Sequence, residues 1–186
     1  MTDRLASAGP GVRLREAFEH IARTRMAGLP FLNAALRVDV VGLRDWQGQW
    51  LCVLVTPWSM NLVLLPGCAA WPALPAGGER FVSLPAGRYR FIANADERCG
   101  EYHACSLFSP VLEFADHESA RATAEAALVA LFDAGNAPTP EQYAAGTRIE
   151  APRASTVPAD PDEPVAVSKR DFLKGRFAGT GHVDRG

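Results

Sequence analysis

Two stretches of the chain repeat apolar residues at the spacing of an amphipathic helix. The first covers residues 12–27 and meets a stop signal at Gly28. The second begins after Asp116, a good N-cap residue, and runs to Gly135. Its many alanines predict a helix that packs closely on a sheet. The apolar stripes comprise Leu14, Phe18, Ile21 and Ala22 in the first helix, and Ala120, Ala124, Ala127, Leu128, Leu131 and Phe132 in the second.

Between these two stretches, short apolar runs alternate with turn residues. The sequences RDWQGQ, LPAG and DERCG are typical of turns between strands. Strands preceded and followed by helices, without regular alternation, favour an α+β fold. We therefore expect an antiparallel sheet of about five to six strands, flanked by two helices. The expected strands cover residues 35–43, 50–58, 60–67, 80–84, 88–95 and 102–109.

Composition changes twice along the carboxyl-terminal part. Six prolines and few apolar residues fall between residues 134 and 167, which is the composition of a disordered linker. The only two lysines of the chain follow, in residues 168–186. The predicted organisation is a flexible amino terminus, a globular domain, a Pro-rich linker and a disordered tail, with bounds 1–11, 12–134, 135–167 and 168–186.

Charge and hydrophobicity exclude several classes of partner. A formal net charge of −2 and a pI of about 6.1 provide no basic surface for nucleic acid. No apolar run approaches the ~18 residues that a membrane span requires, and the first residues lack the apolar core of a secretory signal. We expect a cytoplasmic protein that does not insert into membranes.

Signatures of catalysis are missing from the sequence. It contains no G-x-S-x-G, H-E-x-x-H, phosphate-binding glycine loop or G-x-G-x-x-G, so we expect neither an enzyme nor a bound cofactor. The residue types of Cys99, His103 and Cys105 suit zinc, and their parity places them on one strand face. The two cysteines would nevertheless be roughly 20 Å apart in an extended strand, and no fourth ligand is evident. We therefore interpret the three as ordinary strand residues.

An aromatic and methionine group permits two interpretations. Trp58, Met60 and Phe108 can be core residues, or they can line a partly exposed apolar groove. Pro57 and Pro110 stand at apparent strand ends, so such a groove would lie at the rim of the sheet.

The tail contains the sequence SKRDFLKG, residues 168–175. It is similar to the twin-arginine export motif Ser-Arg-Arg-x-Phe-Leu-Lys, with lysine in the first arginine position. Export signals stand at the amino terminus before an apolar run, whereas the residues after this motif are few and polar. The motif residues are Ser168, Lys169, Arg170, Phe172, Leu173 and Lys174.

Three longer phrases carry a family resemblance. RMAGLPFLNAALRVDVVGLRDWQGQWLCVLVTPWSMNLVLLPG, LPAGRYRFIAN and ACSLFSPVLEFADHESARATAEAALVALFD closely resemble the HybE-type [NiFe]-hydrogenase assembly chaperones, which include rubredoxin-associated versions. The resemblance implies a non-enzymatic protein that binds the small or large hydrogenase subunit, with other maturation proteins, and holds the twin-arginine signal before export. Rubredoxin cysteine pairs are absent from this chain, so iron binding is not implied. Within the family phrases, we predict partner-binding roles for Trp58, Met60, Asn61, Phe108, Pro110 and Glu113.

The resemblance leaves three readings of the tail motif. It can be a pseudo-substrate that occupies the chaperone's own groove, a short docking helix capped by Ser168, or a coincidence. The alternative to the chaperone reading is a redox or metal protein that protects cofactor assembly from oxygen through Cys99, His103 and Cys105.

Overall fold

A computed structural model describes residues 9–137 of the chain. The expected α+β fold is confirmed, with six antiparallel strands and two main helices. The linker and tail predicted for residues 135–186, including the export-like motif, lie almost entirely outside the described residues. The elements are α2 (Pro10–Arg23), β1 (Asp39–Trp46), β2 (Gln49–Val55), β3 (Met60–Leu65), β4 (Glu79–Leu84), β5 (Gly87–Asp96), β6 (Gly100–Phe108), α3 (His117–Leu131) and the short 3₁₀ helix η1 (Ala134–Asn136).

The sheet consists of two three-stranded meanders that meet at its centre. Its strand order is β1-β2-β3-β6-β5-β4, so β3 and β6 form the seam between the meanders. The β1–β2 turn has positive φ at Gln47 and Gly48, 52° and 73°, the backbone of a type I′ hairpin. The β5–β6 hairpin closes with Asp96 paired to Gly100. The predicted turn DERCG is thus confirmed, whereas the turn predicted for RDWQGQ is confined to Gln47 and Gly48, because residues 44–46 belong to β1 and Gln49 begins β2.

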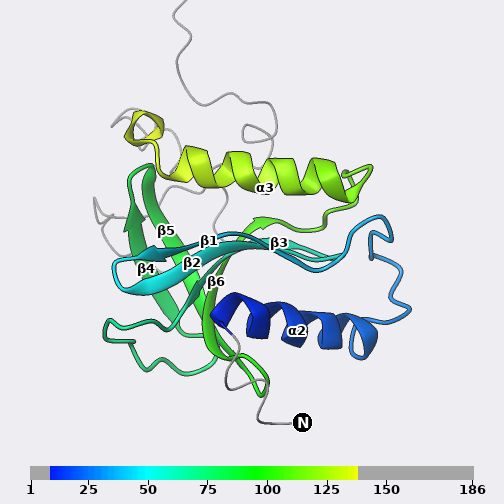
Figure 1. Cartoon of the computed structure of the whole chain (residues 1–186), viewed down its shortest axis with the longest axis horizontal. Coiled ribbons are helices and arrows are strands. Elements are labelled where there is room, and N and C mark those ends of the chain that lie inside the picture. The colour runs from blue at the N-terminus through cyan, green and yellow to red at the C-terminus, as the bar shows by residue number, and fades with distance from the viewer. Residues whose placement is uncertain (1–8, 138–186) are drawn as a thin grey trace, which may run out of the picture. The chain divides into compact units, whose positions relative to one another are not determined.

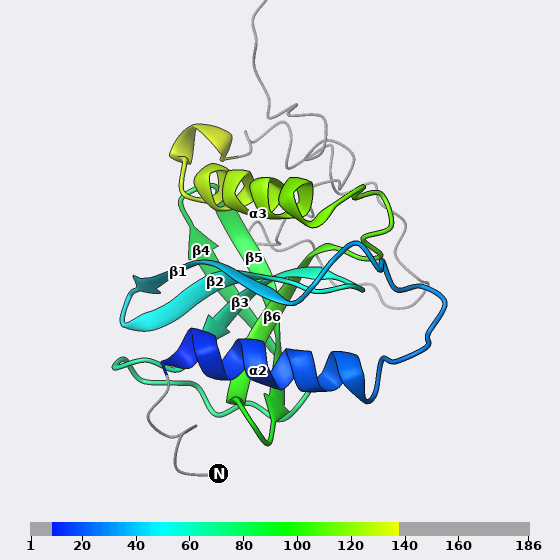
Figure 2. The ribbon, with the colours of Figure 1, turned by 45° about the vertical axis from the view of Figure 1, so that its right-hand side comes forward.

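Helix α2 covers one face of the central strands (Figures 1 and 2). Leu14 and Phe18 of the predicted stripe are buried, as is Ala17, because they pack on alternate residues of β2 and β3. The resulting apolar cluster excludes water from this face of the sheet. Its buried members are Leu14, Ala17, Phe18, Val38, Cys52, Leu54, Val63 and Leu65. The other predicted stripe residues, Ile21 and Ala22, are half-buried against the same cluster.

Helix α3 covers the opposite face (Figures 1 and 2). The predicted alanine stripe is confirmed, since Ala120, Ala124 and Ala127 are fully buried. A β-bulge between Val41 and Arg44 adds one residue to β1, and Gly42 there has φ 65°. A Cβ atom at Gly42 would overlap the side chain of Leu128 on α3. Glycine therefore permits both the bulge and the close approach of the helix.

Several predicted boundaries were wrong. The first helix runs from Pro10 to Arg23 rather than 12–27, because the Thr24 hydroxyl bonds the His20 carbonyl and the Met26 amide turns back to Ile21. The second helix ends at Leu131, before Gly135. Strand β2 ends at Val55, and the following TPW residues, predicted as strand, form a turn.

Residue contacts divide the chain into two units. Of the described residues, the first comprises residues 9–80 and 90–129, and the second comprises residues 81–89 and 130–137. Within the second unit, the Ala86 amide donates to the Leu131 carbonyl at 3.1 Å. The Arg88 guanidinium also lies 4.7 Å from the centre of the Phe81 ring.

The helices in the described part of the chain are too short or too polar to cross a membrane.

Candidate partner-binding site

Three loops of the first unit gather at one end of the sheet (Figures 1 and 2). They are residues 24–38 between α2 and β1, residues 56–59 between β2 and β3, and residues 109–116 between β6 and α3. We call this surface the loop end. The antiparallel order explains the gathering, since β2 and β6 both end where β1 and β3 begin.

Asn33 holds the three loops together. Its backbone amide donates to the Pro57 carbonyl at 2.7 Å. Its side-chain amide donates to the carbonyls of Val111 and Phe114, at 3.0 and 2.7 Å. Its side-chain oxygen accepts the Ala35 amide at 3.0 Å. One half-buried side chain thus fixes loops that are about 80 residues apart in sequence, as the separations of 78 and 81 positions show.

The TPWS turn between β2 and β3 is fixed by its own hydroxyls. The Thr56 hydroxyl accepts the Ser59 amide at 2.9 Å and donates to the Ser59 carbonyl at 2.8 Å. Threonine and serine favour such local bonds, which compete with strand pairing. The turn holds Trp58 half-buried, with its ring stacked on Phe18 at a centroid distance of 6.4 Å.

Large apolar side chains remain exposed at the loop end. Leu29 and Phe31 are 37% and 43% exposed, and Leu112 is 55% exposed. Single exposed apolar residues are common on protein surfaces, but several on one end mark a candidate interaction surface. Because Asn33 fixes their backbone, binding a partner there would order few additional residues.

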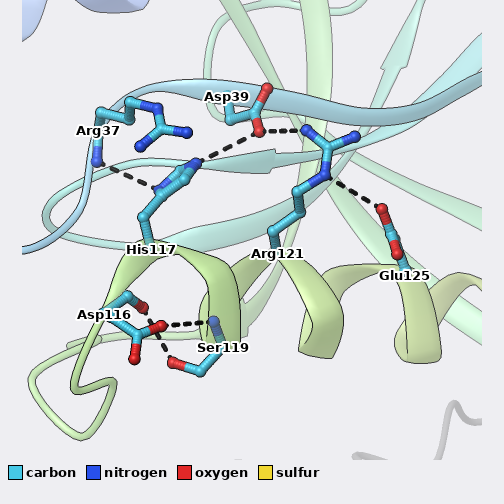
Figure 3. A network of polar contacts seen from close by, with 7 residues as sticks. All are labelled: Arg37, Asp39, Asp116, His117, Ser119, Arg121 and Glu125. Atoms are coloured by element: carbon cyan, nitrogen blue, oxygen red, sulfur yellow. Dashed lines mark hydrogen bonds and ion pairs between the residues drawn. The ribbon is translucent and has the colours of Figure 1, made fainter.

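A polar network anchors the start of α3 beside the loop end (Figure 3). His117 Nδ1 accepts the Arg37 amide at 3.4 Å, so Nε2 carries the hydrogen that faces Asp39 Oδ2 at 3.3 Å. The same oxygen of Asp39 accepts a hydrogen bond from Arg121 at 2.7 Å, and Arg121 also pairs with Glu125 at 3.1 Å. The network ties α3 to β1 and to the preceding loop.

Asp116 is the N-cap of α3, as predicted. Its carboxylate accepts the Ser119 amide at 2.7 Å. This backbone hydrogen bond, with the one from the Ser119 side chain, lowers the pKa of Asp116 below its usual value. The carboxylate lies in solvent and stays ionised near neutral pH. With exposed Glu113 and Glu118, it makes this side of the loop end acidic.

The six residues predicted to bind a partner fall in different places. Met60 and Phe108 are 0% and 1% exposed, so of the two interpretations offered for them the core one applies, and neither side chain lines an exposed groove. Asn61 is half-buried on the α2 face of the sheet, where its amide bonds Ser59 Oγ at 3.1 Å. Only the remaining three, Trp58, Pro110 and Glu113, lie on the loop end, where Trp58 is half-buried and the other two are exposed.

Sequence reasoning missed Asn33 and Leu112. An asparagine in a loop gives no sign of the long-range bonds that it makes. Leu112 had a local signal, because an apolar residue between Pro110 and Glu113 stands outside any strand or helix pattern.

The three residues considered for zinc do not converge. Cys99 lies in the β5–β6 turn and packs on the α2-side cluster, because Gly100, with φ 79°, interrupts the strand alternation. Within the sheet, His103 pairs with Leu64, whereas neighbouring Val63 joins the α2-side cluster. His103 therefore faces the other way, and the expected common face was wrong. Within residues 9–137, no group of three or more His, Cys, Asp or Glu residues is placed to hold a metal ion.

His103 instead packs beneath the loop that follows β3. Its ring lies 4.2 Å from the Trp71 ring, and the Trp71 indole donates to Glu101 at 2.8 Å. Burial, with the nearby Arg80 guanidinium, lowers the pKa of His103. This histidine is therefore a neutral core residue at physiological pH.

The chain is similar to proteins of one known family. The family described as "[NiFe]-hydrogenase assembly, chaperone, HybE" matches residues 10–175. The chain is 45% identical over 129 residues to "Hydrogenase expression/formation protein HupT" of Azotobacter chroococcum, covering 68% of this chain and 85% of that protein. It is 37% identical over 165 residues to "Hydrogenase expression/formation protein HupJ" of Bradyrhizobium diazoefficiens, covering 89% and 87%.

A solved structure shares the fold. The solution structure of HybE from Escherichia coli matches with a TM-score of 0.57 at 24% identity, covering 82% of this chain and 90% of that one.

Proposed function

Because the chain belongs to the HybE family of [NiFe]-hydrogenase assembly chaperones, we propose that it binds a hydrogenase subunit precursor in the cytoplasm before export. The contact is made by the loop end, and the client includes the twin-arginine signal of the small subunit. The protein acts by binding, without a catalytic step. Other maturation proteins then meet the client while this chaperone holds it.

The observation that carries the proposal is the exposure of Leu29, Phe31 and Leu112 on loops clamped by Asn33. Apolar residues on a fixed backbone suit a client that is itself apolar and not yet folded into its final complex. The apolar segment of an export signal has that character. The acidic side of the loop end, with Glu113 and Asp116, suits the basic residues that precede such a segment.

Copurification tests the proposal. A tagged full chain is isolated from cells that express the hydrogenase, with the small subunit present either complete or without its signal. Antibodies against each subunit identify the captured client. We expect capture of the small-subunit precursor that falls when the signal is removed. Failure to capture either subunit, from cells that contain both, would contradict the chaperone role.

Leu112→Asp and Val129→Asp provide the matched pair for that experiment. Both residues are exposed and apolar, at 55% and 70%, but Val129 lies in the last turn of α3, whereas the loop end joins the first turn of that helix at His117. We expect Leu112→Asp to reduce capture and Val129→Asp to leave it unchanged.

A further inference from the structure

We propose that the carboxyl-terminal segment of this chain, residues 168–175, docks on the loop end and competes there with the client. This inference rests on the proposed function in one respect: the segment and the client are proposed to bind the same surface. The segment would act as a tethered inhibitor that a client must displace.

The loop end offers chemistry that needs a partner. Its apolar residues are partly exposed, and its exposed acids Glu113 and Glu118 make no ion pair within the described residues. Arg37 is a nearby exposed cation, but the three exposed carboxylates of Glu113, Asp116 and Glu118 outnumber it. A ligand that fits combines apolar side chains with positive charge.

The segment has that combination. SKRDFLKG places Phe172 and Leu173 between basic residues, with Lys169 and Arg170 on one side and Lys174 on the other. It contains the only two lysines of the chain. The family match extends to residue 175, so the segment falls inside the region that the family shares.

The tether is long enough. About 30 residues separate Ala137, the last described residue, from Ser168. Fully extended, a stretch of that length reaches about 100 Å, several times the ~22 Å length of a helix such as α3. A ligand on a tether of this kind acts at an effective concentration of order millimolar. Even weak docking would therefore occupy much of the surface, which favours the chain's own segment over a second copy.

Docking would weaken client binding by a predictable factor. When a tethered ligand occupies about 90% of the sites, the apparent affinity for a competing ligand falls about tenfold. A client that also contacts surface beyond the segment's footprint would still displace it.

Reciprocal NMR shifts in the full chain test docking without any hydrogenase subunit. Arg170→Ala with Phe172→Ala should shift the amide signals of residues 29–36, 57–59 and 110–116. The matched tail change, Arg153→Ala with Val157→Ala, should leave those signals in place. In the other direction, Leu112→Asp should shift the amides of residues 168–175, whereas Val129→Asp should not.

Each outcome is decisive. Docking within one chain is supported if the tail variant shifts the loop-end signals, the loop-end variant shifts the tail signals, and neither shift changes when the protein is diluted. Shifts that disappear on dilution would show contact between copies and overturn the proposal, as would the absence of loop-end shifts with the tail variant, which leaves the described fold untouched. Because no client is present in the NMR experiment, it can show that the tail does not dock even when copurification shows that the precursor is bound. Likewise, the tail can be found to dock even when no precursor is captured.

Discussion

The side-chain amide of Asn33 lies 2.7 Å from the carbonyl oxygen of Phe114, across 81 positions of sequence. This bond and its companion to Val111 join the loop before β1 to the loop before α3. The loop end is therefore a fixed part of the fold, although all three of its segments are loops. That fixed backbone presents the apolar side chains of the proposed binding surface.

Replacing Asn33 with alanine should destabilise the fold. The change removes two long-range hydrogen bonds, so the Phe114 carbonyl loses the Asn33 donor and the Val111 carbonyl keeps only the Phe114 amide at 3.4 Å. We expect a loss of about 2–3 kcal/mol in the free energy of unfolding. Asn94→Ala, which removes one bond to Ile92 two residues away, should cost less than about 1 kcal/mol. Urea denaturation measures both, and equal losses would contradict the clamp.

Replacing Gly42 with alanine should reveal the close approach of α3. The variant combines strain from a positive φ with overlap on Leu128, and we expect a cost of about 2–4 kcal/mol. Gly77 also has a positive φ, 84°, but open space around the position of a Cβ atom. Gly77→Ala should therefore cost only about 1 kcal/mol. Thermal unfolding of the two variants separates overlap from backbone strain, and a similar cost would rule out the packing role.

The sheet and both helices could be predicted because the spacing of apolar residues and the residue types in the turns agree with the way the elements pack. Alternation and turn residues indicate all six strands, and the alanine stripe from Ala120 to Ala127 identifies the buried face of α3. Boundaries failed where a local side-chain bond decides the end of an element. Thr24 ends α2, and Thr56 turns residues that have strand-like composition.

The candidate site was less predictable for a different physical reason. Exposure depends on which parts of a strand face other elements cover, and Met60 and Phe108, which were predicted to bind a partner, are buried. Phe108 meets Phe114 of that loop edge-to-face at 5.7 Å. Asn33 donates hydrogen bonds to backbone carbonyls of another loop. Every residue has a backbone carbonyl, so the residue types of these partners could not reveal the bonds.

The thiols should differ sharply in reactivity. Burial raises the pKa of Cys52 to about 12 and those of Cys99 and Cys105 to about 11, so at pH 8 only about one in a thousand of the latter two is thiolate. Cys68 is exposed. Iodoacetamide on the native protein should therefore give a single adduct at Cys68, located by peptide mass spectrometry. Denatured protein provides the control with four adducts, and rapid native labelling of Cys99 would contradict the packing.

Asp116 should make stability depend on pH in the acid range. Its pKa is lowered in the folded state by hydrogen bonds from Ser119, and the unfolded value is about 3.9. The contribution of its carboxylate is therefore present above about pH 4 and is lost as pH falls through the lowered folded value. Asp116→Asn should make the free energy of unfolding fall less steeply as the pH is lowered below about 4. An NMR titration that finds the Asp116 pKa at or above the unfolded value would contradict the cap.

The central claim is that the loop end binds the hydrogenase precursor, and the affinity of purified small-subunit precursor for the full chain tests it most directly. Calorimetry should compare Leu112→Asp with Val129→Asp, both in the Arg170→Ala, Phe172→Ala background so that the tail does not compete. We predict that Leu112→Asp weakens binding at least tenfold, about 1.4 kcal/mol or more, and that Val129→Asp changes it less than twofold. Unchanged affinity with Leu112→Asp, in a protein that binds the precursor and retains its fold, would contradict the assignment of the loop end.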